Sequence, residues 1–136
     1  MRTNERGYSV AVEAAIIIPA LVLLIGLVAT GAQLALANQQ VGAAAAHAAR
    51  TAAMARDTGS APGLARDAVA AMLADSSCDN PVTTVSVVGV IDEVGQQGQF
   101  VVGVSCELTV LGLPGLPSRF TVSQQRRAPI DSYRSR

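Results

Sequence analysis

Apolar residues fill one long stretch near the amino terminus of the chain. Within residues 14–36 the only clearly polar side chains are Thr30 and Gln33, and no charged residue occurs over 14–49. The 23 residues of 14–36 measure about 35 Å as a helix, which covers a hydrocarbon core of about 30 Å. Their twelve Leu, Ile and Val residues contribute roughly 4 to 7 kcal/mol to insertion. The pattern therefore predicts a membrane-spanning helix.

The helical pattern continues beyond the apolar stretch. An Ala-rich run follows Leu36 and has high helix propensity, with no stop signal before "RDTGSAPG" at residues 56–63. Pro19 is compatible with one bent helix, because neighbouring groups in a membrane segment satisfy the carbonyl that a proline frees. We expect one helix from about residue 8 to about residue 56, with its outer half beyond the membrane.

A short second helix is predicted over residues 61–76. Ser60 is its candidate N-cap and Pro62 suits its first turn. Apolar residues recur there at helical spacing, and they are Leu64, Ala65, Ala68, Val69, Met72 and Leu73.

The pattern then changes to a period of two, which predicts strands over 82–90, from residue 99, and from residue 119. One face of the middle strand gathers the apolar residues Phe100, Val102, Val104, Cys106, Leu108 and Val110. The segment "DEVGQQG" makes the first connection a hairpin, and "LPGLP" is a turn signal before the third strand. The fold class is therefore α+β: a long amino-terminal helix, a short second helix and a three-stranded antiparallel sheet packed on helix surface.

Charges at the two ends of the apolar stretch bear on its orientation. Arg2 and Arg6 favour a cytoplasmic amino terminus, which places the carboxy-terminal part outside. Glu13 stands at the edge of the bilayer, where headgroups and water reduce the cost of about 2.5 to 3.5 kcal/mol that it would carry at the centre. We expect a cytoplasmic leader over 1–13, a transmembrane segment over 14–36 and an extracytoplasmic α+β module over 37–136.

A signal peptide is the main alternative to a membrane anchor. The Ala35-x-Ala37 pattern offers a cleavage site before Asn38. Against cleavage, the apolar stretch exceeds the usual 7 to 15 residues, and the amino-terminal region mixes Glu with Arg instead of being purely basic. In this alternative, residues 1–37 act as signal or anchor for a Sec-secreted or membrane-tethered binding module whose strand edges contact an extracellular partner.

Composition argues against several classes of function. The formal net charge is zero, and the ten basic residues are all Arg and are scattered, so nucleic-acid binding is not expected. His47 is the single histidine and the two cysteines are far apart, so we expect no catalytic residues, no metal site and no cofactor. Neither an enzyme nor a protein with a small-molecule substrate is indicated.

Cys78 and Cys106 are a candidate disulfide, because an outward module lies where disulfides persist. A bridge enclosing 27 residues would contribute about 3 to 4 kcal/mol by loop closure. A hairpin centred near Gln96 would place Cys78 opposite residue 114, so residues 79–81 would have to turn over the sheet to reach Cys106. In the alternative, Cys106 is a buried small apolar residue and Cys78 is a free thiol.

The amino-terminal third of the chain resembles the TadE-like family, minor pilin-like proteins of the tight-adherence (Flp) pilus and related secretion systems. The resemblance covers roughly residues 5–55. Its elements, in order, are Gly7, Glu13, Pro19, the segment "QQVGAAAAHAAR" and Arg50. It implies a pilin-like arrangement and a minor pilin or pseudopilin role in a Flp pilus or a type II/IV-related secretion apparatus. The implied location is the bacterial cytoplasmic membrane, and the implied partners are other pilin-like subunits.

The resemblance also implies roles for three residues. In such precursors a prepilin peptidase cuts after the Gly, so Gly7 and Tyr8 would flank the cut and Tyr8 would carry a free amine. Glu13 would then pair with such an amine on a neighbouring subunit, which repays part of the desolvation cost of each ion. Glu13 would be the sixth residue after the cut, whereas the family pattern usually has it fifth, a difference of about 100° around the helix. As the alternative, Glu13 is an interfacial carboxylate that the helix macrodipole favours.

Overall fold

The computed structural model describes residues 5–89, 98–110, 112 and 114–130, with the side chains of 5–10 excepted. The elements in chain order are α1 (Glu5–Ala53), α2 (Ala61–Leu73), β1 (Cys78–Val88), β2 (Gln99–Thr109) and β3 (Arg119–Pro129). Both strand pairings are antiparallel and the sheet order is β1-β2-β3. The predicted α+β class and its elements are confirmed. The predicted hairpin loop over residues 92–98 falls, except for residue 98, outside the described residues.

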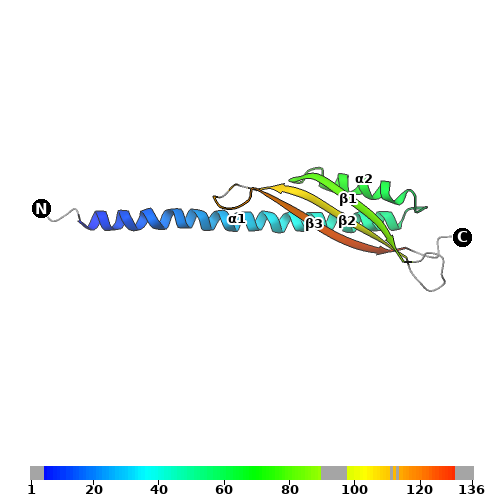
Figure 1. Ribbon diagram of the computed structural model, residues 1–136, viewed down its shortest axis with the longest axis horizontal. Coiled ribbons are helices and arrows are strands. Elements are labelled where there is room, and N and C mark those ends of the chain that lie inside the picture. The colour runs from blue at the N-terminus through cyan, green and yellow to red at the C-terminus, as the bar shows by residue number, and fades with distance from the viewer. Residues whose placement is uncertain (1–4, 90–97, 111, 113, 131–136) are drawn as a thin grey trace.

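The helix α1 has two halves with different surroundings. Its 49 residues run without interruption through Pro19. The amino-terminal half projects alone, whereas α2 and the three strands gather around the carboxy-terminal half (Figure 1). The long first helix that the sequence predicts is therefore present. Its amino-terminal half is uncovered, and its carboxy-terminal half is part of the packed α+β module.

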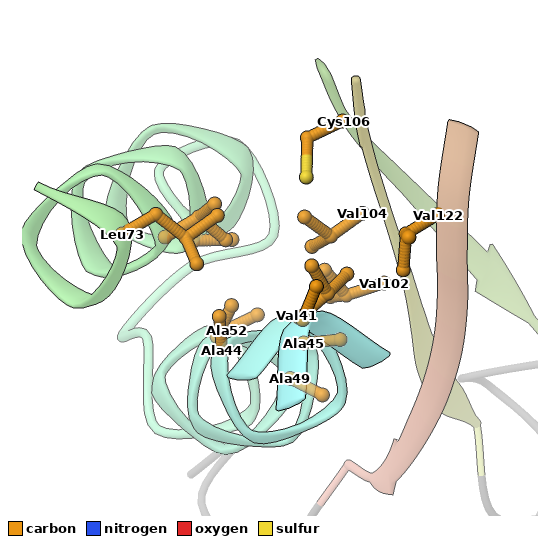
Figure 2. Packing of buried hydrophobic residues seen from close by; sticks show 14 of the residues in the cluster. Val41, Ala44, Ala45, Ala49, Ala52, Leu73, Val102, Val104, Cys106 and Val122 are labelled. Atoms are coloured by element: carbon orange, nitrogen blue, oxygen red, sulfur yellow. The ribbon is translucent and has the colours of Figure 1, made fainter. Parts of the chain in front are cut away.

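Alanine is the residue that lets α1 approach both neighbours closely. The buried residues of its outer half are Ala37, Val41, Ala44, Ala45, Ala48, Ala49 and Ala52. Ala44 and Ala52 lie on the side of α1 toward α2, while Ala45 and Ala49 lie toward the sheet (Figure 2). Because alanine adds so little volume, the core is filled from the other side, by Val, Leu and Phe of α2 and β2.

Enlarging one of these alanines is expected to destabilise the module. Ala48 is 0% exposed, so Ala48→Leu inserts three carbons where no space exists and costs about 1 to 3 kcal/mol. Ala43→Leu is the matched control, because Ala43 is exposed on the same helix. Thermal unfolding followed by circular dichroism measures both. Equal midpoints for the two variants would contradict the packing of α1 described above.

The central strand β2 carries the sheet's part of the core. Its alternation is the one that the sequence predicts, and Phe100, Val102, Val104, Cys106, Leu108 and the following Val110 are all buried. The turn predicted at "LPGLP" is also present, at Pro114 and Gly115. The third strand begins at Arg119, as predicted, and runs to Pro129, whereas β1 ends at Val88, two residues before the predicted end.

The second helix buries a narrower stripe than predicted. Ala61, Ala65, Val69 and Leu73 are buried, a single row at four-residue spacing. Leu64 and Met72 are 42% and 47% exposed, so their assignment to the core face was wrong. The physical reason is that α2 lies at one side of the core, where its main contacts are with α1 and the edge strand β1. The helix also ends at Leu73, three residues before the predicted end.

Ser60 is the N-cap residue of α2, as predicted, and its carbonyl accepts a hydrogen bond from the Leu64 N–H at 3.2 Å, but its side chain does not cap the helix. Its hydroxyl makes no capping bond to α2 and instead contacts the Asp57 carboxylate at 3.1 Å, while its backbone N–H donates to Asp57 Oδ1 at 2.7 Å. The backbone N–H, and then the hydroxyl, hold the pKa of the Asp57 carboxyl below its ordinary 3.8. The resulting contribution to folding is present above the ordinary pKa and is lost as pH falls through the lowered one.

A bulge in β1 replaces the turn predicted before the first strand. The strand begins at Cys78, not at residue 82, and its pairing with β2 shifts between Asp79 and Val82. Asn80 has a positive φ of 50° there. Because a shift of one residue moves a side chain to the other face, the bulge turns Cys78 to the inner face, opposite Leu108, although Val82 points outward. Cys78 therefore lies opposite Leu108, not opposite residue 114 as in a straight strand from a hairpin centred near Gln96, and the bulge takes the place of the turn over the sheet that was expected at residues 79–81.

Candidate functional site

The amino-terminal half of α1, which no other described element covers (Figure 1), is called the bare half; it is the most unusual surface of the molecule. By length and composition this helix can cross a membrane, and its most apolar stretch of 18 residues contains no buried residue. Exposed large apolar side chains follow one another from Val12 to Val28. Single exposed apolar residues are ordinary on soluble proteins, but a continuous helical surface of them is not. A bilayer, or the apolar helices of other subunits, provides the environment that this surface needs.

Glu13 is the only charged residue over positions 11–49 of this surface. Its side chain is exposed, and no described residue of the chain forms an ion pair with it. Gly7 and Tyr8 lie in the first turns of α1. Tyr8 and Glu13 are five positions apart, which separates them by about 140° around a helix. An amine at Tyr8 therefore does not lie on the Glu13 face of its own helix, and a pair between them would join two subunits.

The module first covers α1 at Thr30. This residue is 7% exposed, and its hydroxyl donates to the Gly26 carbonyl at 2.9 Å, so its polar group is satisfied within the helix. Leu34 is half-buried and packs against the core, and Ala37 follows it into the core. The hydropathy pattern gave no sign of this boundary between the uncovered and the covered part of α1. Leu34 and Ala37 have the same hydropathy whether lipid or protein covers them.

Polar side chains fix the module on α1 just beyond this point. Gln124 of β3 donates its amide to Asn38 Oδ1 at 3.1 Å. A cleft of about 200 Å³ lies nearby, lined by Gln33, Leu36, Ala37, Gln40, Ser77, Leu108 and Thr109. The Asn38 contact was not found from the sequence. The only available signal was the change from Leu and Val to "NQQ" at residues 38–40.

Cys78 and Cys106 are brought together at the same end of the module. The structure joins them in a disulfide, with Cα atoms 5.6 Å apart and a sequence separation of 28. The Cys106 side chain points from β2 into the core above Val104 (Figure 2) and is 2% exposed. The link connects β1 to β2 directly after the end of α2. It therefore holds together the part of the module that stands closest to the bare helix.

The remaining candidate residues form no second site in the part of the chain that the structure describes. His47 is exposed on α1, where its carbonyl accepts a hydrogen bond from Thr51. The described residues contain no group of three or more His, Cys, Asp or Glu side chains that could hold a metal ion. The chemistry that these residues offer is thus limited to the Glu13 charge and the disulfide.

Comparison with known protein families gives a match for the amino-terminal part of the chain. The family profile described as TadE-like protein matches residues 9–50, which confirms the resemblance seen in the sequence for that segment. The matched segment includes Glu13 and most of α1, but it begins after Gly7 and Tyr8 and covers less than half of the chain. No curated protein and no solved structure matches the chain.

Proposed function

We propose that this protein is a TadE-like, pilin-like structural component of a tight-adherence (Flp) pilus or a related secretion apparatus. In this proposal α1 anchors the chain once in the bacterial cytoplasmic membrane, with residues 1–13 cytoplasmic and the module outside. Glu13 pairs with the amino terminus of a neighbouring subunit, which a prepilin peptidase exposes at Tyr8. The protein has a structural role and no catalytic one.

The observation that carries the proposal is the division of α1. The family match over residues 9–50 spans both the bare apolar half and the start of the half that holds the module. A helix that is apolar and free at one end and covered by a small α+β module at the other suits a subunit that assembles laterally through its helix. Glu13 adds the single charge that such an assembly can use to set the register between neighbours.

The signal-peptide alternative conflicts with the packing of the core. Cleavage before Asn38 would remove Thr30 and Ala37, which are 7% and 6% exposed, together with the half-buried Leu34. It would also cut inside an uninterrupted helix, directly before Asn38, whose side chain accepts a hydrogen bond from Gln124. A segment that contributes buried side chains to the folded module is poorly suited to removal.

Photocrosslinking from the bare helix tests the proposal in the native membrane. A benzoylphenylalanine in place of Val22, which is 60% exposed, is expected to form adducts with other pilin-like subunits, identified by mass spectrometry. The matched control places the same group at Val88, which is 53% exposed on β1 and far from α1's bare half (Figure 1). If Val22 forms adducts only with lipid, or the same adducts as Val88, the assembly role is wrong.

A further inference from the structure

The loop that joins β2 to β3 is apolar and uncharged in sequence, and the residues of it that the structure describes are exposed. Its described residues, 112 and 114–118, are called the apolar loop below. All are exposed, and Leu116 is its largest described apolar side chain, at 43% exposure. No charged residue occurs between Glu107 and Arg119. The loop therefore contains no charge that would oppose its transfer from water to a less polar environment.

The apolar loop has a defined shape. The backbone N–H of Val110 donates to the Ser118 carbonyl at 2.9 Å and closes its base. Pro114 and Gly115 form a turn in which Gly115 has a φ of +88°, close to the value of the third position of a type II turn. The proline ring restricts the backbone of this turn before any contact is made, so ordering the neighbouring Leu116 on a surface costs less conformational entropy.

The apolar loop lies at the level where α1 becomes bare. In Figure 1 it stands beside α1, at the end of the sheet that points toward the amino terminus. The cleft lined by Gln33 and Leu36 of α1 and by Thr109 places the end of β2 beside the same part of the helix. Thr30 is the first described side chain of α1 that is buried, whereas Val28 is 65% exposed.

The length of the uncovered helix places this level at the membrane surface. Between Glu13, which the proposed function places at the cytoplasmic edge, and Thr30 lie 16 residues without a buried side chain, or about 24 Å of helix. A hydrocarbon core of about 30 Å that begins after Glu13 therefore ends just beyond Thr30, where the module and its apolar loop begin. The loop is then continuous with the lipid-facing surface of α1.

We propose that the apolar loop is a second membrane contact, with Leu116 inserted into the interfacial layer of the bilayer from which α1 emerges. The inference rests on the proposed membrane anchoring. A single helix leaves its module free to tilt and to rotate about the helix axis. A second contact beside the helix fixes both, so each subunit presents the same face to its neighbours before assembly. The outer end of the span then lies near Thr30.

Depth-dependent fluorescence quenching tests this contact. The chain contains no Trp, so one introduced Trp reports alone. The test variant is Leu116→Trp, and the matched control is Leu64→Trp, because Leu64 is 42% exposed in the first turns of α2, near the far end of α1. Leu23→Trp marks the span itself. The full-length chain is reconstituted into phosphatidylcholine vesicles brominated either near the headgroup end or near the middle of the acyl chains.

The expected result is a loss of fluorescence for Leu116→Trp that is larger with shallow bromines than with deep ones, and no loss for Leu64→Trp. Equal behaviour of these two variants would overturn the proposal. Emission from Leu116→Trp that shifts to the blue with rising protein-to-lipid ratio, without bromine quenching, would assign the loop to a neighbouring subunit and also overturn it. An unquenched Leu23→Trp would show that the membrane anchoring itself has failed.

Discussion

Replacing both Cys78 and Cys106 with Ser is expected to lower the free energy of unfolding of the module by about 3 to 4 kcal/mol. The bond closes a loop with a sequence separation of 28, and breaking it returns that loop entropy to the unfolded chain. The effect is large here because the core relies on Ala and Val and holds few larger apolar side chains. For a domain of this size the thermal midpoint falls by more than about 10 °C, measured by circular dichroism in detergent.

Two controls separate the bond from the side chains. Reductant added to the unchanged protein is expected to reproduce most of the loss, because both sulfur atoms stay in place. The Ser76→Ala variant removes a nearby hydroxyl that donates to the Leu73 carbonyl at 2.7 Å, and it is expected to cost about 1 kcal/mol or less. Two reactive thiols in unreduced, denatured protein from an oxidising compartment would show that the bond does not form.

The Glu13→Ala variant is expected to stop assembly while leaving membrane insertion intact or improved. Removing the carboxylate from the bilayer edge lowers the cost of insertion. It also leaves the amine of the neighbouring subunit unpaired in a poorly solvated site, at a cost of about 3 kcal/mol or more. That cost weakens each contact between subunits by about 100-fold. The amount of protein in sheared surface filaments, relative to the amount in carbonate-washed membranes, measures the effect.

Matched variants make the Glu13 result specific. Glu107→Ala is the same substitution at an exposed position on β2, and it is expected to assemble normally. Glu13→Asp keeps the charge and is expected to retain part of the assembly. Normal filaments with Glu13→Ala would leave Glu13 as an interfacial carboxylate near the helix end and would remove the pairing role.

The elements that the sequence predicted well are those set by long local patterns. The uncharged and Ala-rich residues of α1 leave helix as the only choice over most of Glu5–Ala53. The alternation of β2 identifies its buried face, because a half-buried strand has a period of two. Both signals are repeated many times within one element, so an error at one position does not change the conclusion.

The features that the sequence did not predict depend on contacts between elements. The bulge at Asn80 reverses the face of Cys78, and no local pattern shows where a strand will skip a residue. Leu64 looks as suitable for the core as Ala65, yet Ala65 is buried and Leu64 is exposed. Thr30 is buried in the folded chain, and hydropathy alone gives no sign of this, so it placed the end of the apolar segment without reference to the module.

The features of the candidate site also divide into those that the sequence identifies and those that depend on contacts between elements. Glu13 stands out in the sequence because it is the only charge beside a long apolar stretch, and the structure leaves it without a partner among the described residues. The pairing of Cys78 with Cys106 follows from there being two cysteines, but the register that makes it possible does not. The hydrogen bond from Gln124 of the module to Asn38 of α1 has no pattern that a single sequence reveals.

The intact mass of the protein recovered from carbonate-washed membranes decides whether α1 stays whole as the anchor and as part of the module. We expect the mass of all 136 residues, or that mass less residues 1–7, with Gly7→Leu restoring the full mass in the second case. A soluble species that begins at Asn38 would contradict it, because the mature protein would then lack both the bare helix and the buried residues that join it to the module.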